Sequence, residues 1–178
     1  YTGTGNFTGT GNDLRNLLTG GAGADILSGL DGVDTLRGGV GQDQLKGGRG
    51  GDLLDGGDGT DTASYIDATS GVWADLARTI LSTSAGEAAG DRFVSVERLR
   101  GSNHADQLWG DAAANALWGM SGNDTIAGRG GNDILYGGLG DDRFIFALGD
   151  AADRVSDFQD NRDTLAFQGF AGVSTVQD

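Results

Sequence analysis

The sequence predicts an all-β fold in which short parallel strands wind into a right-handed β-roll, a flattened solenoid. Three observations predict it. A nine-residue pattern recurs in register through two arrays, which is the mark of a repeat architecture. Glycine dominates positions one, two and four of the pattern, and the chain of 178 residues holds 35 glycines and no proline. An acid or its amide recurs at position six and a single apolar residue at position eight.

The first array consists of repeats that start at Gly11 and recur every nine residues up to Gly56. Position six of these repeats holds Asn16, Asp25, Asp34, Asp43, Asp52 and Asp61. Position eight holds Leu18, Leu27, Leu36, Leu45, Leu54 and Ala63. The array therefore covers residues 11–64.

The second array consists of repeats that start at Gly101 and recur up to Gly137. Position six holds Asp106, Asn115, Asp124, Asp133 and Asp142, and position eight holds Leu108, Leu117, Ile126, Leu135 and Phe144. One step back along the same count places Glu97 at position six and Leu99 at position eight. We therefore expect this array to span residues 92–146.

Three further segments surround the arrays. Residues 1–10 carry the duplication YTGTGN–FTGTGN two residues out of register, which predicts an irregular N-terminal strand and turn. Residues 65–91 connect the arrays, and the alternating Val72, Ala74 and Leu76 predict one strand there. Residues 147–178 contain RVSDF and DTLAF around a polar turn, which predicts a C-terminal β-hairpin.

Each repeat divides into a six-residue loop and a three-residue strand. A three-residue strand cannot reverse the chain alone, so two repeats are expected to form one turn, with loops eighteen residues apart stacked on the same edge. Stacked strands lie about 4.8 Å apart, and two carboxylates at that distance repel by about 3 kcal/mol at an effective dielectric of 20. Something other than the side chains must hold these loops together.

Calcium fits this requirement, because it takes six to eight oxygen ligands and the loops offer bare glycine carbonyls and carboxylates. In the first array the candidate ligands are Asn16, Gly21, Gly23, Asp25, Gly32, Asp34, Gly39, Gly41, Asp43, Gly48, Gly50, Asp52, Gly57, Gly59 and Asp61. In the second array they are Glu97, Asp106, Asn115, Gly122, Asp124, Gly131, Asp133, Gly138, Gly140 and Asp142. Two loops per site predict several ions, roughly five to eight.

The pattern GGxGxDxUx, where U is a large aliphatic residue, resembles the nonapeptide of the RTX (repeats-in-toxin, hemolysin-type) calcium-binding proteins. The region from about Tyr65, with SVERLRGSNHADQLWG and the DRVSDF…DTLAF tail, resembles the C-terminal modules of serralysin-type proteases and related secreted bacterial enzymes. This resemblance implies a β-roll, calcium-dependent folding, secretion through the type I machinery and an upstream domain in a larger extracellular protein.

Several acids and loops fit the pattern less well. The loop from Gly101 has His104 where glycine belongs, and the loop from Gly110 has Asp111, Ala113 and Asn115, so we expect both to bind calcium poorly or to turn without metal. We expect His104 to be a tolerated loop residue rather than a ligand. The tail acids Asp153, Asp157 and Asp163 either hold a further ion, with Asp157 and Asp163 as candidate ligands, or act as ordinary caps and turn residues.

Position nine points away from the core and carries aromatic residues in the second array. Trp118 and Tyr136 are eighteen residues apart and should lie side by side, while Trp109, Ala127 and Ile145 should line the opposite face. Either the connecting segment or the terminal hairpin covers these rings, or they form an exposed patch that docks a glycan or a neighbouring domain.

Composition weighs against other function classes. The formal net charge is −14, which disfavours nucleic acid and anionic membrane surfaces, and no apolar run is long enough to span a membrane. A single histidine cannot supply a zinc-protease motif. We therefore expect a non-catalytic module whose parent could be a protease, lipase or alginate epimerase. The threonine pairs Thr2–Thr4 and Thr8–Thr10 resemble ice-binding ladders but do not continue along the array.

Overall fold

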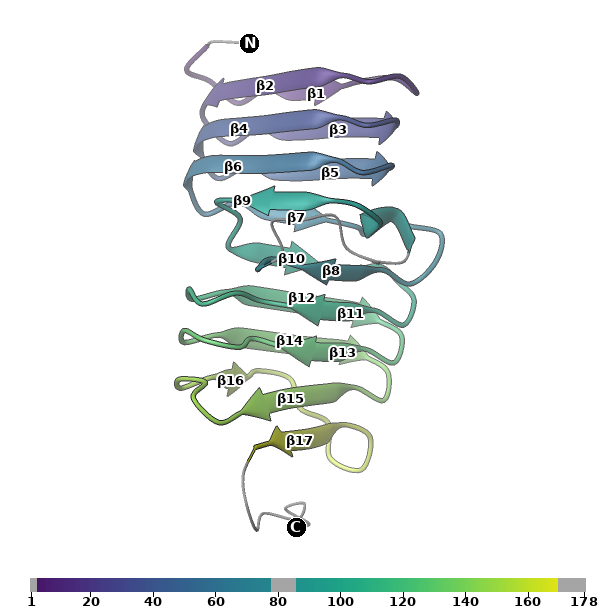
Figure 1. Ribbon diagram of the computed structural model, residues 1–178, viewed down its shortest axis with the longest axis vertical. Helices are drawn as coiled ribbons and strands as arrows, with labels where there is room; N and C mark the ends of the chain where they lie inside the picture. Colours follow the sequence, from purple (N-terminus) through teal and green to yellow (C-terminus); the bar gives the residue numbers. More distant parts are fainter. Residues whose placement is uncertain (1–2, 78–85, 170–178) are drawn as a thin grey trace.

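The computed structural model describes residues 3–77 and 86–169 and forms a parallel β-solenoid of about eight turns. Figure 1 shows the turns stacked along the long axis of the molecule, with the two ends of the chain at opposite ends of the stack. Within the described residues one short 3-10 helix, η1 (Gly86–Ala88), accompanies the strands. The predicted right-handed parallel β-roll is confirmed.

One side of the solenoid is a continuous eight-stranded sheet that passes through both arrays. Its strands, in spatial order, are β1 (Thr8–Thr10), β3 (Ile26–Asp31), β5 (Gln44–Arg49), β7 (Thr62–Ser64), β10 (Arg98–Arg100), β12 (Ala116–Ser121), β14 (Ile134–Leu139) and β16 (Arg154–Val155).

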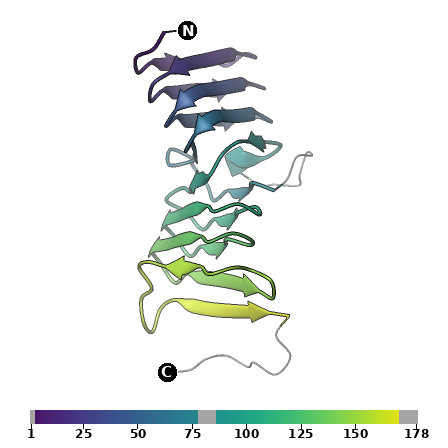
Figure 2. The same cartoon turned by 90° about the vertical axis from the view of Figure 1, so that its left-hand side faces the viewer.

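The other side is divided into two sheets. The four-stranded sheet contains β2 (Leu17–Ala22), β4 (Thr35–Gly41), β6 (Leu53–Gly59) and β9 (Arg92–Val94). The five-stranded sheet contains β8 (Trp73–Asp75), β11 (Gln107–Trp109), β13 (Thr125–Ala127), β15 (Arg143–Ala147) and β17 (Thr164–Gln168). Figure 2 shows the same stack from the side.

Neighbouring strands within each array pair in register at a spacing of eighteen residues. Leu27 lies opposite Leu45, and Leu117 lies opposite Leu135, which confirms two repeats per turn. The residues at position eight form the centre of the core, which they enter from the sheets on both sides. Those with no exposed surface are Leu27, Leu36, Leu45, Leu54, Ala63, Leu99, Leu108, Leu117, Ile126, Leu135 and Phe144.

The N-terminal segment departs from the sequence expectation, because β1 is in register with the array rather than two residues out of it. Thr8 pairs with Ile26 and Gly9 with Leu27. Gly9 therefore occupies a core position without a side chain, and the Phe7 ring fills the space, since a Cβ on Gly9 would lie 2.7 Å from that ring.

The connecting segment contributes the predicted strand, β8, and Val72, Ala74 and Leu76 are all buried. The strand pairs with β11 and so begins the five-stranded sheet. After η1, the chain returns to add β9 to β6 and β10 to β7. The solenoid thus continues through the junction between the arrays.

The predicted C-terminal hairpin is wrong. β16 pairs with β14 and β17 pairs with β15, both in parallel. The tail continues the solenoid because each of its strands still places an apolar residue two positions after an acid, as the repeats do: Val155 follows Asp153 and Leu165 follows Asp163. No helix in the described part of the chain is long and apolar enough to cross a membrane.

Candidate calcium-binding rims

The acids at position six form two ladders, one along each edge of the solenoid where loops enter the sheets. On one edge the backbone N–H of Asp25 donates to Oδ1 of Asp43 at 2.8 Å, and that of Asp43 donates to Oδ1 of Asp61 at 2.7 Å. Each acid therefore uses one oxygen to bind the preceding turn. The same contact recurs in the second array, where the N–H of Asp124 donates to Oδ1 of Asp142 at 2.9 Å.

The second oxygen of most of these carboxylates is buried and has no hydrogen-bond partner among the described residues. These orphaned Oδ2 atoms belong to Asp25, Asp34, Asp43, Asp52, Asp61, Asp124, Asp133, Asp142 and Asp153. A buried carboxylate oxygen without a partner costs free energy unless a cation neutralises it. The rims therefore need a positive ion.

The loop glycines form the rest of the cradle. The predicted ligand glycines all adopt a positive φ, for example 135° at Gly50 and 147° at Gly41. A Cβ on Gly50 would lie 1.5 Å from the carbonyl oxygen of Gly32, and one on Gly41 would lie 1.8 Å from that of Gly23. Glycine is thus required both by the backbone and by the close approach of carbonyl oxygens from the preceding turn.

Burial raises the pKa of several rim carboxyls. The pKa of Asp52, Asp61 and Asp133 rises to about 6, and that of Asp124 to about 7. Burial is the largest cause in each case. Hydrogen bonds from the backbone lower the pKa, and the carboxylate on the adjacent turn adds to the rise for Asp52, Asp61 and Asp124. In the absence of a cation, the ionised ladder is therefore unfavourable near neutral pH.

The donor set fits calcium rather than a metal held by side chains alone. In residues 3–77 and 86–169, no group of three or more His, Cys, Asp or Glu side chains lies close enough to hold a metal ion. The carboxylates instead come in pairs, one from each of two stacked loops, beside main-chain carbonyls. Calcium accepts such a mixture of carboxylate and carbonyl oxygens.

Five stacked pairs have orphaned oxygens on both members. They are Asp25–Asp43, Asp43–Asp61, Asp34–Asp52, Asp124–Asp142 and Asp133–Asp153. Three lie in the first array and two in the second, counting the tail acid Asp153 with the second. Asp153 thus occupies a position-six place on the rim.

Other predicted ligands bond to the protein itself, although the side-chain nitrogen of Asn115 is buried without a partner among the described residues. Both oxygens of Asp106 accept hydrogen bonds from Ser102, and Asn115 accepts one from the N–H of Asp111. Asn16 donates its amide to the carbonyls of Asn12 and Leu14. These irregular loops close through side chains, and His104 lies exposed within the Gly101 loop. Poor calcium binding by the Gly101 and Gly110 loops stays a prediction.

The tail acids Asp157 and Asp163 are also satisfied without metal. The two oxygens of Asp157 accept from the N–H groups of Gly137 and Gly138, and those of Asp163 accept from the N–H groups of Asp142 and Gln159. This favours the capping alternative for both residues. Glu97, in contrast, takes a place on the ladder, since its Oε2 accepts from the N–H of Asp61 at 2.9 Å.

The nine-residue spacing does not predict Asp91 as a rim residue. Its Oδ1 accepts from the N–H of Asp52 at 2.8 Å, so it occupies a position-six place on the rim, while its Oδ2 accepts from the Tyr65 hydroxyl at 2.7 Å. Burial raises the pKa of Asp91 to about 8. The available signal was its spacing, because Asp91 stands two residues before the buried Phe93, as position six stands before position eight.

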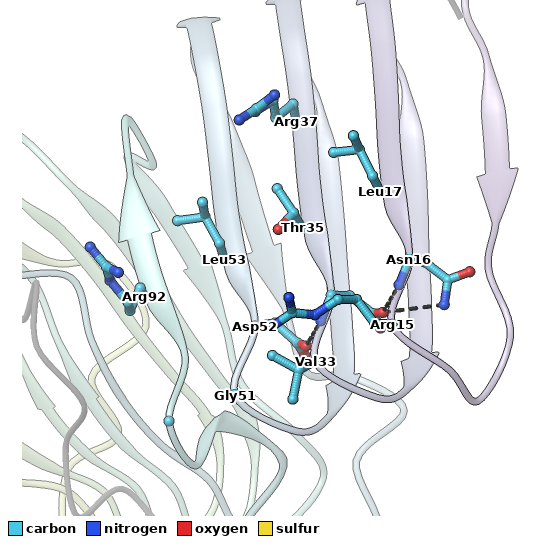
Figure 3. Close-up of a pocket in the computed structure, with 12 residues that line it drawn as sticks. Arg15, Asn16, Leu17, Val33, Thr35, Arg37, Gly51, Asp52, Leu53 and Arg92 are labelled. Atoms are coloured by element: carbon cyan, nitrogen blue, oxygen red, sulfur yellow. Dashed lines mark hydrogen bonds between the residues drawn. The ribbon is translucent and has the colours of Figure 1, made fainter.

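A hollow borders the first-array rim, and the rim residues Asn16, Asp34 and Asp52 line part of it (Figure 3). We call it the arginine cleft, because Arg15, Arg37 and Arg92 line it together with Leu17 and Leu53, and its volume is about 620 Å³. It forms in part because position five is glycine at Gly51 and Gly90.

Comparison with known proteins gives one family match. The family described as the RTX calcium-binding nonapeptide repeat (4 copies) matches residues 10–45, 28–63 and 109–144. Together these ranges cover about half of the chain, fall in the two arrays and contain all the orphaned carboxylates except Asp153. No curated protein matches the chain.

Proposed function

The chain belongs to the family of RTX calcium-binding nonapeptide repeats, and from this premise we propose that calcium drives its folding as a non-catalytic module of a larger secreted bacterial protein. RTX repeats are calcium-binding and typical of secreted proteins. The observation that carries the proposal is the row of buried, unpartnered Oδ2 atoms along both rims. Calcium supplies the charge that these oxygens lack.

The proposed ligands are the paired position-six carboxylates together with carbonyl oxygens of the stacked glycine loops. The five fully orphaned pairs set a lower bound of about five ions, within the range of roughly five to eight expected from two loops per site. Loops with one orphaned partner, such as those of Asn16 and Glu97, are the candidates for additional ions.

The biological use of this chemistry follows from calcium concentration. A chain of net charge −14 with few apolar side chains stays loose where calcium is scarce. Extracellular calcium modules bind at roughly 10⁻⁴–10⁻³ M, so the chain would fold after leaving the cell. Passage through the type I machinery and attachment to an upstream domain complete the proposal, and both rest on the resemblance stated above.

A calcium titration tests this function. Far-UV circular dichroism of the metal-free chain should show little β structure at neutral pH and gain it on addition of calcium, and equilibrium dialysis should count at least about five ions. A β spectrum unchanged by chelator would contradict the proposal.

A matched pair of variants sharpens the test. Asp43→Asn removes a carboxylate shared by two of the orphaned pairs, so it should raise the calcium midpoint roughly tenfold and reduce the ion count. Asp55→Asn makes the same charge change on the outer face of β6, away from the ladder, and should leave both unchanged. Equal effects of the two substitutions would show that net charge, rather than the rim geometry, controls folding.

A further inference from the structure

The outer face of the eight-stranded sheet differs in charge from the rest of the molecule. In each strand, the two residues flanking the buried position-eight residue point outward. In the described strands of this sheet none of them is acidic, although the chain holds 26 Asp and Glu. The basic residues on this face are Lys46, Arg98, Arg100 and Arg154. The strands of this face thus place no acidic side chain beside the core position, and the acids that approach it, Asp67 and Glu87, come from the connecting segment near Lys46.

The arginines of this face form no ion pair within the described residues, although Arg98 is close enough to lower the pKa of Asp61 by its charge, against the larger rise from burial. Lys46 pairs with Asp67, whereas Arg98, Arg100 and Arg154 form no ion pair with any described residue. Arg98 and Arg100 come from the same strand, β10, on either side of Leu99. A guanidinium group that is not held in an ion pair can bind an external carboxylate through two parallel hydrogen bonds.

Aromatic residues continue this face. Trp118 and Tyr136 stack with ring centroids 5.4 Å apart and planes inclined by 7°, which confirms that the two rings lie side by side. Both are partly exposed rather than covered. Trp109 on the opposite face lies under the guanidinium of Arg129, 5.5 Å from the ring centroid, and Arg129 is itself fixed by Asp75. Of these three rings, therefore, Trp118 and Tyr136 face the open side.

A groove of about 340 Å³ lies between the arginines of β10 and the aromatic residue Trp118. Trp118 and Met120 line one part of it, Arg98 and Arg100 another, and Gln44 and Thr62 supply hydrogen-bonding groups. A ligand here would meet an aromatic ring, two cations and neutral polar side chains. The strands that form this face follow one another along the solenoid at a spacing of about 4.8 Å.

We propose that this groove, which we call the Arg98–Trp118 groove, binds an acidic polysaccharide. A hexuronate unit would place its carboxylate on Arg98 or Arg100, its hydroxyls on Gln44 and Thr62, and the C–H face of its sugar ring against Trp118. A linear glycan can extend along the stacked strands from Trp118 toward Tyr136, since these two partly exposed rings lie side by side. In the calcium-loaded state proposed above, the bound ions offset the negative charge of the rims. The rims then repel a polyanion less than they do in the metal-free chain.

Calorimetry on the calcium-saturated chain tests the proposal. The probes are oligogalacturonate and hyaluronan oligosaccharides, with a neutral cello-oligosaccharide and an oligoglutamate matched in length and charge. We expect binding of at least one acidic oligosaccharide, weakened by added salt, and none of the neutral sugar. Failure of both acidic sugars to bind would overturn the proposal, and so would equal or tighter binding of oligoglutamate, which would identify an acidic polypeptide as the partner.

Substitutions locate the site. Arg100→Gln and Trp118→Ala should each weaken binding roughly tenfold or more, whereas Trp118→Phe should retain most of the affinity. The matched control is Arg37→Gln, which removes an arginine from the arginine cleft on the four-stranded sheet (Figure 3). Loss of binding in Arg37→Gln with no loss in Arg100→Gln would move the site to that cleft and overturn the proposal.

Two further measurements separate binding from folding. Calcium titrations followed by circular dichroism should be unchanged in all four variants, because none of these side chains belongs to a rim ladder. A sedimentation experiment without sugar should show the same oligomeric state for the parent chain and Arg100→Gln. Dissociation of an assembly in that variant would show that the groove instead receives a second copy of the chain.

Discussion

A single glycine carries two separate constraints in these loops. At Gly50 the backbone has a φ of 135°, which a side chain disfavours, and the Gly32 carbonyl oxygen occupies the space that a Cβ would need. Position two shows where the requirement relaxes. Leu30 and Met120 adopt positive φ there, 77° and 81°, and each lies one turn after an irregular loop. Regular stacking, rather than loop formation alone, therefore selects glycine.

Gly50→Ala should destabilise the calcium-loaded chain by about 2 kcal/mol or more, because it adds backbone strain to a collision with a main-chain oxygen. Gly130→Ala is the control. Its Cβ would have Ala112 as nearest neighbour at 3.4 Å, an ordinary contact, so its effect should be small. Chemical denaturation in saturating calcium measures both, and similar losses would show that the carbonyl contact does not matter.

Titration of the rim carboxyls gives a pH dependence to the metal-free chain. The pKa of Asp52 and Asp61 lies near 6 in the fold, above the ordinary value of 3.8. The folded state therefore binds more protons between about pH 4 and pH 7, and its free energy of unfolding falls as pH rises through that window. Circular dichroism of the metal-free chain should show more β structure at pH 4.5 than at pH 7.5.

Calcium should reverse this trend, because it binds the ionised carboxylates and its affinity rises as they lose protons. The calcium-saturated chain should keep its β structure at pH 7.5. A metal-free chain that gains structure as pH rises would contradict the raised pKa values of Asp52 and Asp61.

At the scale of strands and loops, the nine-residue spacing predicts the residues that belong to regular repeats. It does not find residues that take an equivalent place in the fold after an insertion. The position-eight core, the positive φ of the loop glycines and the pairing of Trp118 with Tyr136 all follow from counting nine. Asp91 escapes the count because an insertion separates it from the array, although it performs the same backbone contact as Asp52. The same limit applies to the tail, where the sequence predicts a hairpin, because the strands there pair at spacings of 20 and 21 residues while the Asp-x-apolar units remain.

In the connecting segment, a tyrosine hydroxyl takes the place beside a rim carboxylate that a cation is proposed to take elsewhere. The Tyr65 O–H donates to the otherwise orphaned Oδ2 of Asp91, within a cluster of buried side chains that includes Val72 and Phe93. This junction is thus held by an ordinary core and a hydrogen bond rather than by paired orphaned carboxylates.

Tyr65→Phe should leave that oxygen buried and unpartnered, at a cost of about 1–3 kcal/mol, without changing the number of calcium ions bound. Tyr136→Phe removes the same hydroxyl from a partly exposed ring on the outer face and should have little effect. Thermal unfolding in saturating calcium, with ion counting by dialysis, measures both consequences. A lost ion in Tyr65→Phe would show that the junction holds metal after all.

At the scale of the whole molecule, the orphaned carboxylates form two groups with a junction between them that closes by hydrogen bonds. Three fully orphaned pairs precede Tyr65 and two follow Ser102, while the eight-stranded sheet runs through both groups. Solenoid stability is close to a sum over nearest-neighbour turns. The junction supplies apolar burial on both sides, so each group has a neighbour that does not depend on calcium.

Each array should therefore load calcium without the other. In the double variant Asp124→Asn/Asp142→Asn, amides of residues 119–142 should exchange at least about tenfold faster with solvent in calcium, while those of residues 20–61 stay protected, since opening is local when the coupling between distant turns is weak. The mirrored variant Asp34→Asn/Asp52→Asn should expose the first array and spare the second. Hydrogen exchange read by mass spectrometry distinguishes the two segments. Loss of protection in both arrays from either substitution would show that the continuous sheet, and not the local ions, sets the size of the cooperative unit.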